Sequence, residues 1–384
     1  MHEQALHPGA AGPSARPRRG LRLLTASVAL AVAPALAAGC AHFDEAQSAP
    51  FTPVQEMGAG GGAPSPNVPP TITPPESPPP SSSAPAEKPE TGECVDPDPA
   101  VIATCLGPTA AVVGLPESAE AIIAESDSGR MSTVSENGDP KPFATIDPAE
   151  GSVVSLALSP SYAQDKLVFA ALVSGRETKI VRIAAGDAAK VVASGLPGSP
   201  NSRAGIAFDG DTMLLGVGTE VLSFPGYTGI GNAPAPKRLA SSTQPISGLC
   251  TGAGIFPGVY ATAGGDSGAG GELLRVDQGA AVRVWSWPDQ SDLGGCALTQ
   301  TGPAVALPSA KRVDMLTVDP ASGVAPNPPA PLAEDKYGRF SGVGLMAGNA
   351  LVGTTTNKSG GAPTATDDRA VILPIEGTTT DERT

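Results

Sequence analysis

Histidine is the most common catalytic base and metal ligand in proteins, so the positions of the histidines in this chain limit its chemistry. There are three, His2, His7 and His42. The rest of the chain has no imidazole, which excludes Ser-His-Asp and Cys-His catalysis there, as well as a histidine-ligated zinc or iron site. An oxidation or hydrolysis carried out by that part needs Asp, Glu, Lys, Tyr or a cofactor as its base.

Five cysteines form the second chemical group: Cys40, Cys94, Cys105, Cys250 and Cys296. If Cys40 is lipidated, four remain, an even number that favours two disulfides in an exported chain. A bond between Cys94 and Cys105 would close a short loop where the folded domain begins. Cys250 and Cys296 lie in neighbouring copies of a repeat, one strand position out of step, which suits a bridge between adjacent sheets. We therefore predict the pairs Cys94 with Cys105 and Cys250 with Cys296.

The first 39 residues resemble a bacterial lipoprotein signal. Four arginines precede an apolar run over residues 23–38, and the run ends in Leu36-Ala37-Ala38-Gly39-Cys40. The sequence departs from the usual pattern at Ala37, where Leu is common. The prediction is lipidation of Cys40 and anchoring in the bacterial cell envelope, on a periplasmic or outer-membrane face. The alternative is an ordinary secretory signal that is cut near Ala38.

Composition separates a linker from a folded domain. Residues 40–92 are rich in Pro, Gly and Ser and offer little apolar surface, so we predict a disordered linker, followed by the folded domain over residues 93–384. Removing the four arginines and one glutamate before Cys40 from the 24 basic and 38 acidic residues leaves a net charge of about −17. This charge argues against a nucleic-acid partner.

A weak repeat organises the folded domain. In its clearest copy two apolar stretches, residues 153–158 and 167–173, flank the corner Ser159-Pro160-Ser161. About six copies recur, at residues 110–124, 151–173, 205–217, 247–263, 294–307 and 341–354. A spacing of roughly 40 to 50 residues is the period of four-stranded propeller blades, and helical periodicity is nearly absent. The repeat predicts an all-β, radially repeated fold.

Four segments carry a family resemblance. GSVVSLAL at 151–158 is similar to the family motif GGLLDVALHPDF, and GGELLR at 270–275 with Trp287-Pro288 is similar to GGDELNRI…GWP. GRFSGV at 338–343 is similar to GRLRDV. Thr356-Asn357 with DDRAVI at 367–372 is similar to TSN…DDRILRI. These motifs resemble the soluble sugar dehydrogenases that use pyrroloquinoline quinone (PQQ), the glucose/sorbosone dehydrogenase family. The resemblance implies a six-bladed β-propeller of four-stranded blades, with its site at the mouth of the central channel.

The resemblance carries over poorly at the catalytic positions. The family's basic His lies in an HNGGRLAF segment, and Asn201 of NSRAGIAF takes its place here. An amide cannot accept a proton from a sugar hydroxyl near neutral pH. Gln244 falls where the family has an Arg. Both substitutions imply a degenerate oxidation site.

The resemblance also suggests how a cofactor would be held. Arg339 keeps the first Arg of GRLRDV, Ser341 replaces the second, and Lys311 lies within one position of the family's lysine, so Arg339 and Lys311 are candidate PQQ ligands. Glu272 is a candidate calcium ligand. Solvated charges at blade edges are the alternative for Arg339 and Lys311.

Two further pairs have structural interpretations. Asp367 and Asp368 are predicted as turn residues that bond their own backbone, rather than as ligands. Trp285 and Trp287 are predicted to pack in the core or channel wall.

Three functions follow from these observations. The first is an exported lipoprotein whose sugar-dehydrogenase propeller has lost most or all PQQ-dependent oxidation. The second is an active PQQ-dependent aldose dehydrogenase with another base. The third is a non-catalytic propeller that binds an envelope protein or a glycan.

Overall fold

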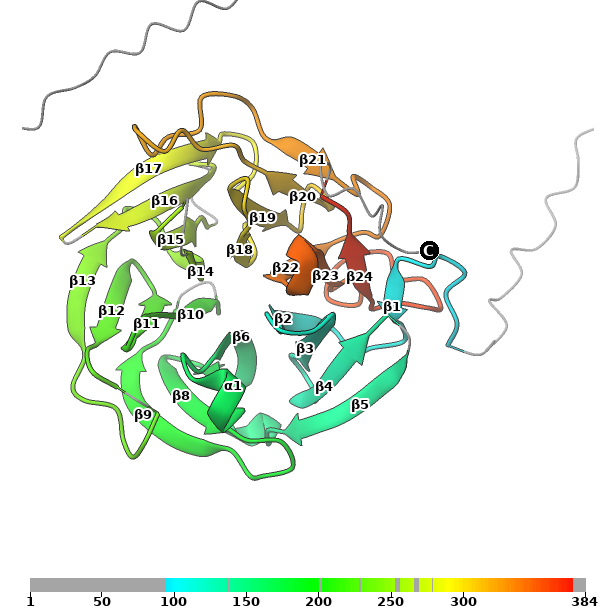
Figure 1. The fold of residues 1–384 in the computed structure, drawn as a ribbon, viewed down its shortest axis with the longest axis horizontal. Coiled ribbons are helices and arrows are strands. Elements are labelled where there is room, and N and C mark those ends of the chain that lie inside the picture. The colour runs from blue at the N-terminus through cyan, green and yellow to red at the C-terminus, as the bar shows by residue number, and fades with distance from the viewer. Residues whose placement is uncertain are drawn as a thin grey trace, which may run out of the picture. The chain divides into compact units, whose positions relative to one another are not determined.

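In this computed structural model, the described residues form twenty-four strands, arranged as a closed ring of six antiparallel, four-stranded sheets (Figure 1). The structure describes residues 94–375 except 137, 200–201, 228, 253–255, 266–268 and 278. The predicted signal, Cys40 and the linker lie outside the described residues. The predicted six-bladed, nearly all-β propeller is confirmed. Within the described ranges, no helix has the length and apolar character needed to cross a membrane.

The innermost strand of each blade lies beside the central channel. These inner strands are β2 (Thr109–Gly114), β6 (Ser152–Leu158), β10 (Ala204–Asp209), β14 (Ile246–Gly252), β18 (Cys296–Leu298) and β22 (Phe340–Leu345). The second strands are β3 (Glu120–Glu125), β7 (Val168–Ser174), β11 (Thr212–Val217), β15 (Gly258–Ala263), β19 (Pro303–Leu307) and β23 (Leu351–Thr355). Each predicted repeat therefore corresponds to the inner two strands of one blade.

The remaining strands lie toward the rim. The third strands are β4 (Arg130–Ser135), β8 (Glu177–Ile183), β12 (Glu220–Phe224), β16 (Gly271–Asp277), β20 (Arg312–Met315) and β24 (Ala370–Leu373). The outer strands are β5 (Gly138–Thr145), β9 (Lys190–Pro197), β13 (Lys237–Ser241), β17 (Ala280–Trp287), β21 (Ala330–Leu332) and β1 (Val101–Ala103). Short helical turns are α1 (Tyr162–Asp165) and two 3₁₀ turns, Pro148–Glu150 and Ala347–Asn349. Helix α1 lies at the corner predicted after Ser159.

The hydrophobic core is divided into six clusters, one at each interface between neighbouring blades. Strand β7, one of the inner two strands of its blade, shows why apolar and polar residues do not alternate there. Val168 and Leu172 pack toward the β2–β5 blade, whereas Phe169 and Val173 pack toward the β10–β13 blade. Because side chains alternate across a strand, a sheet covered on both faces needs apolar residues at every position.

The first and last described strands meet in one blade. Strand β1 pairs with β24, with Val101 opposite Val371, so an N-terminal strand completes the C-terminal blade. The Cys94–Cys105 disulfide spans the approach to and exit from β1, and Cys250–Cys296 joins the inner strands β14 and β18 of neighbouring blades. Both predicted pairings are present in the structure.

Candidate functional site

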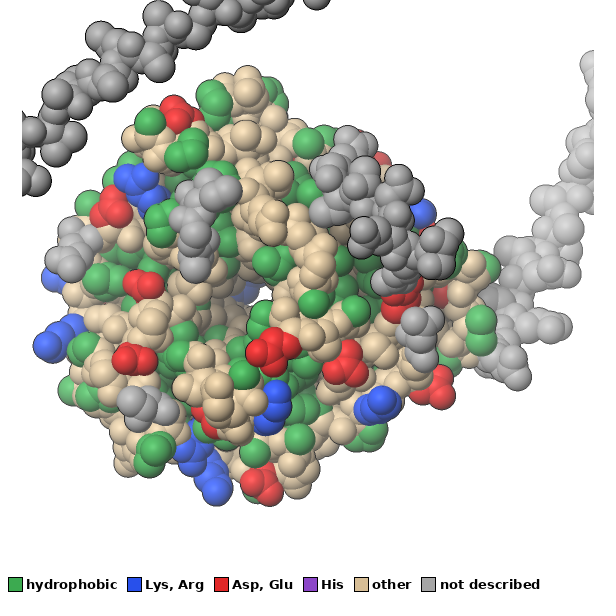
Figure 2. Space-filling model, in the orientation of Figure 1, with side chains coloured by type: hydrophobic (Ala, Val, Ile, Leu, Met, Phe, Trp, Pro, Cys, Tyr) green, Lys and Arg blue, Asp and Glu red, His purple; other side chains and the backbone are tan. Residues whose placement is uncertain are grey.

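The channel through the ring opens into a cavity at each end, and Figure 2 shows one face hollowed at the centre of the ring. One cavity, of about 380 Å³, lies at the N-terminal ends of the inner strands, and the other, of about 440 Å³, at their C-terminal ends. The two cavities adjoin, because five buried residues line both of them: Val112, Leu156, Leu249, Cys296 and Val343. The Cys250–Cys296 disulfide thus lies in the channel wall where the two cavities meet.

The cavity at the N-terminal ends is rich in hydroxyl groups. Nine of its 21 lining residues are Ser or Thr, namely Thr109, Ser126, Ser152, Ser155, Ser202, Ser247, Ser341, Thr356 and Ser359. Arg203 is the one charged residue among the described residues that line it. Each hydroxyl can donate one hydrogen bond and accept two, which matches the hydroxyls of a sugar or another polyol. Its volume falls in the range of about 300–1,000 Å³ that is usual for small-ligand sites.

Hydrogen bonds hold part of this hydroxyl lining in place. Thr109 Oγ1 donates to the carbonyl of Thr355 at 2.6 Å and lies 3.0 Å from Ser341 Oγ. Ser155 Oγ accepts from the amide of Ile206 at 3.1 Å, which links β6 to β10 and leaves the Ser155 proton available to a ligand. The lining is therefore fixed by contacts between neighbouring blades.

A cluster of three charged residues lies at the mouth of the same cavity. Asp292, in the connection from β17 to β18, forms an ion pair with Arg203 through Oδ1. Its Oδ2 accepts from Arg339 Nη2 at 3.1 Å and from Ser309 Oγ at 3.1 Å. Arg203 also donates to the carbonyl of Leu293 at 2.8 Å. Both oxygens of Asp292 are thus engaged by donors, and both guanidinium groups face a carboxylate.

The predicted catalytic positions are only partly described. Asn201 lies outside the described residues, although Ser202 and Arg203, which follow it, line the cavity. Gln244 is 7% exposed and precedes β14. Its Oε1 has no hydrogen-bond partner among the described residues. The correspondence of Asn201 and Gln244 to the family's His and Arg stays a prediction from the sequence.

The predicted cofactor and metal ligands do not converge on the cavity. Lys311 lies in the turn between β19 and β20, where its Nζ is 3.5 Å from Asp335 and more than half of the side chain is exposed. Glu272 on β16 pairs with Arg283 at 2.5 Å. In the ranges that the structure covers, no group of three or more His, Cys, Asp or Glu is arranged to hold a metal ion. Arg339 alone of these candidates lies at the mouth, and it is bound to Asp292.

Glu125 is the carboxylate that directly precedes a cavity-lining residue, Ser126. Burial would raise its pKa, but hydrogen bonds from Ser128, Arg130 and the amide of Gly107 outweigh burial and lower it. Arg130 contacts Glu125 with Nε at 3.0 Å and Nη2 at 2.5 Å. A carboxylate with a lowered pKa is a weak general base near neutral pH.

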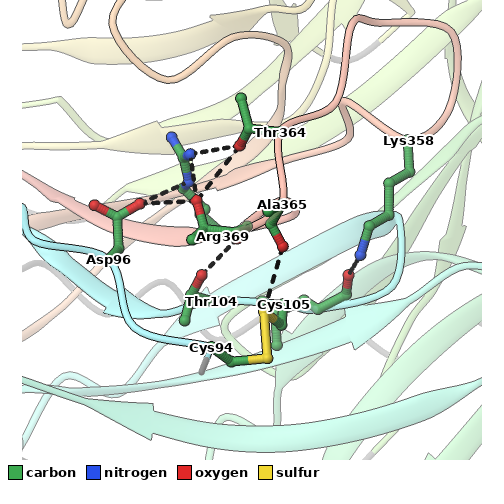
Figure 3. The surroundings of a disulfide bond; sticks show 10 residues. Cys94, Asp96, Thr104, Cys105, Lys358, Thr364, Ala365 and Arg369 are labelled. Carbon is green, nitrogen blue, oxygen red and sulfur yellow. Dashed lines mark hydrogen bonds and ion pairs between the residues drawn. A yellow bond between two sulfur atoms is a disulfide. The ribbon is translucent and has the colours of Figure 1, made fainter. Parts of the chain in front are cut away.

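A second buried acidic group, Asp367 and Asp368, lies where β1 joins the last blade. Figure 3 shows the neighbouring Cys94–Cys105 disulfide. Asp367 accepts from the amide of Thr364 at 2.7 Å and from Asn357 Nδ2 at 2.9 Å. Asp368 accepts from the amides of Asn357 and Lys358. The bond from the Thr364 amide to Asp367 is local, as predicted for a turn residue, whereas Asp368 joins its turn to a segment 10 and 11 residues earlier. Burial, the largest influence, raises the pKa of Asp368 to about 6.

The same region contains a largely buried ion pair. Arg369 Nε lies 3.0 Å from Asp96 Oδ2, close to the Cys94–Cys105 disulfide, and Lys358 Nζ donates to the carbonyl of Leu106 (Figure 3).

Trp287 is packed as predicted: it is 5% exposed, and its Nε1 donates to Asp314 at 2.7 Å. These residues close and stabilise blades.

Sequence reasoning missed Asp292 and the hydroxyl lining. Asp292 lies in the segment Ser291-Asp292-Leu293-Gly294-Gly295, directly before an inner strand, as Ser202-Arg203 lies before β10. Polar residues at the start of successive repeats were the available signal, since all these starts open on the same face of the ring.

Comparison with known proteins supports the fold. No protein-family model matches the chain, and no curated protein matches its sequence. Among solved structures, the aldose sugar dehydrogenase of Streptomyces coelicolor in its PQQ-bound form has a TM-score of 0.60 at 21% identity, covering 71% of this chain and 96% of that one. A protein of Thermus thermophilus described as a glucose dehydrogenase has a TM-score of 0.60 at 19% identity, covering 71% and 98%. The soluble aldose sugar dehydrogenase of Escherichia coli, in its apo-form, has a TM-score of 0.53 at 13% identity, covering 72% and 99%. The predicted resemblance to sugar-dehydrogenase propellers is thereby confirmed at the level of the fold.

Proposed function

We propose that this chain is an exported, lipid-anchored protein whose propeller binds a small polyhydroxyl ligand at the channel mouth and has lost most or all sugar oxidation. The observation that carries the proposal is the composition of the 380 Å³ cavity. Hydroxyl groups dominate its lining, and Arg203, its one described charged residue, is already paired with Asp292. Such a lining can bind hydroxyls, but none of its described residues is a carboxylate or imidazole that could remove a proton.

The described residues do not fit PQQ in the way that the family resemblance implies. A quinone with several carboxylates needs cations directed at it. Arg339 is directed at Asp292 and Lys311 at Asp335, and neither lines the cavity. Glu272 likewise pairs with Arg283 and lacks the further carboxylates that calcium requires among the described residues.

An active PQQ-dependent aldose dehydrogenase is the second candidate function. It is favoured by the fold shared with the Streptomyces coelicolor enzyme that was solved with PQQ. The full chain should be incubated with PQQ and calcium, and dye reduction followed with a panel of aldoses. We expect no turnover above that of a heat-denatured sample. Robust turnover would establish the second function and contradict the degenerate site.

Binding is tested separately from oxidation. We expect neutral monosaccharides at millimolar concentration to raise the melting temperature, because a ligand that binds only the native state stabilises it. The variant that tests the position of the ligand is Ser155→Val. It removes one cavity hydroxyl and introduces a β-branched side chain, which suits a strand. A stabilisation that is the same in wild type and S155V would place the ligand elsewhere, for example on loops that bind a glycan or a protein of the envelope.

The anchor is proposed from Cys40, which lies outside the described residues. Two disulfides in the described chain support an oxidising compartment, and hence export. In a bacterial host the wild-type chain should incorporate labelled palmitate and enter the detergent phase on partitioning. The Cys40→Ser variant should do neither. A wild-type chain that is exported without label would favour the ordinary secretory signal.

A further inference from the structure

We propose that Asp292 is an internal counter-ion that occupies an anion site at the channel mouth and so restricts the ligand to uncharged polyhydroxyl molecules. The inference rests on the proposed binding function and identifies the class of ligand. It concerns the three-residue cluster of Arg203, Asp292 and Arg339.

The cluster joins segments from opposite sides of the ring. Arg203 directly precedes β10 and Arg339 directly precedes β22, and the inner strands β14 and β18 lie between these two in the order around the channel. Asp292 belongs to the connection that leads into β18. The two guanidinium groups therefore approach one carboxylate from two blades that face each other, and the ion pairs lie at the entrance rather than within one blade.

The geometry is that of an anion site with its anion supplied by the chain. Asp292 Oδ1 pairs with Arg203, and Asp292 Oδ2 lies 3.1 Å from Arg339 Nη2 and 3.1 Å from Ser309 Oγ. Two guanidinium groups and a hydroxyl are a donor set suited to a carboxylate. Arg339 Nε is buried without a partner among the described residues, so the guanidinium has donor capacity that Asp292 does not use.

The charge balance explains the expected selectivity. Side-chain exposures of 31%, 25% and 24% for Arg203, Asp292 and Arg339 place the cluster partly out of water, where charges are screened less than on an open surface. A ligand carboxylate that approaches Arg203 meets the like charge of Asp292. An uncharged polyol meets only the hydroxyl lining. Discrimination of this kind works by repelling the wrong ligand.

Stability alone does not account for the cluster. Partly exposed ion pairs contribute about 0–1 kcal/mol to folding. One of the two arginines, Arg203, lines the ligand cavity. Neutralising that arginine changes the potential of the cavity, and this is the effect that we assign to Asp292.

The test compares D-glucose with D-glucuronate, which differ by a carboxylate at one ring substituent. Affinities are measured at low ionic strength by the rise in melting temperature and by calorimetric titration, on wild type and Asp292→Asn. We expect D292N to bind glucuronate at least about tenfold more tightly than wild type does, with little change for glucose. Asp335→Asn is the matched control, because it removes the same charge from an exposed carboxylate paired with Lys311.

The double variant R203Q/D292N should lose the gain for glucuronate, which assigns the effect to the arginine rather than to net charge. Asp292→Ser serves as a second variant if D292N does not fold. The inference is overturned if glucuronate binds the folded Asp292 variants no better than it binds wild type or D335N, whether or not glucose binds. The proposed function fails by different results, namely quinone-dependent turnover or no response to any neutral sugar.

Discussion

Single glycines determine how closely the inner strands approach one another. A Cβ atom built on Gly205 in β10 would lie 2.2 Å from the amide nitrogen of Leu249 in the next blade. A Cβ on Gly294 would lie 2.4 Å from the carbonyl oxygen of Ser341. The neighbours are backbone atoms, which cannot move aside as a flexible side chain can. The small residues that begin the sequence repeats therefore allow the blades to converge on the channel.

We expect Gly205→Ala to destabilise the protein by about 1–3 kcal/mol or more, the usual cost of overpacking. The control is Gly265→Ala, because a Cβ there meets only Pro245 side-chain atoms at 3.4 Å. Urea unfolding measures both. An equal free energy of unfolding for wild type and G205A would contradict the close approach of β10 and β14.

A pH effect is expected from Asp368. Its pKa is raised from 3.8 to about 6 by burial, so the folded state binds a proton more tightly than the unfolded state does. The sign follows from linkage: Asp368 contributes stability below about pH 4, and this contribution is lost as the pH rises to about 6. The shift corresponds to about 3 kcal/mol at most.

The measurement is the free energy of unfolding of wild type and Asp368→Asn at several values between pH 4 and pH 7. The side chain of D368N does not titrate, so the stability of wild type relative to D368N should fall as the pH rises to about 6 and then level off. A difference that is independent of pH would contradict the raised pKa. Asp98, whose pKa is lowered to about 2, acts in the opposite direction below pH 4 and is common to both proteins.

At the scale of elements, the shortest strand pairing among the described residues is between β1 and β24. Strand β1 has three residues, and the backbone around it is fixed by bonds such as Cys105 N to the Thr366 carbonyl at 3.0 Å and Leu106 N to the Asp368 carbonyl at 3.0 Å. The Cys94–Cys105 disulfide encloses this strand, with a sequence separation of 11. The bridge therefore supports a strand whose own pairing is short.

Removing that bridge in the double variant C94A/C105A should cost about 3 kcal/mol by loop-closure entropy. Hydrogen exchange should rise first in β1 and β24, since a short strand opens locally before the ring does. The comparison is C250A/C296A, whose separation of 46 predicts a loss of about 4 kcal/mol. Uniform exchange across all blades in C94A/C105A would contradict a local role.

Elements were predictable from sequence where the pattern repeats. The inner strand pairs recur about six times with small residues at their starts, and the parity of Cys250 and Cys296 indicated neighbouring sheets because alternate residues face opposite blades. The mouth cluster gives no such signal. Asp292 reaches Arg203 and Arg339 across separations of 89 and 47 residues, through side chains in connections that carry no periodicity. Only the closed ring brings these three together.

For the whole molecule, each blade is stabilised by apolar contacts with both of its neighbours. Six separate clusters lie at the six interfaces, so loss of one blade removes two of them. A ring of this kind should unfold as a single cooperative unit rather than blade by blade.

A C-terminal truncation tests ring closure. A chain that ends at residue 369 lacks β24, leaving β1 and β23 without their shared partner. We expect loss of the cooperative thermal transition, measured by near-ultraviolet circular dichroism. The matched control ends at residue 375, keeps all described strands, and should retain a melting temperature within a few degrees of wild type. A cooperative transition in the shorter chain would contradict closure through β24.

Pairing of the first strand with the last also has a consequence for biosynthesis. Val101 leaves the ribosome long before Val371, its partner, has been translated. At about 5–20 residues per second this interval is on the order of tens of seconds. During that time the apolar segment Val101-Ile102-Ala103 has no sheet to join, and its unsatisfied strand edge is open to wrong partners. In a nascent propeller of this design, the outer strand of the last blade therefore stays unpaired until the final strand has been made.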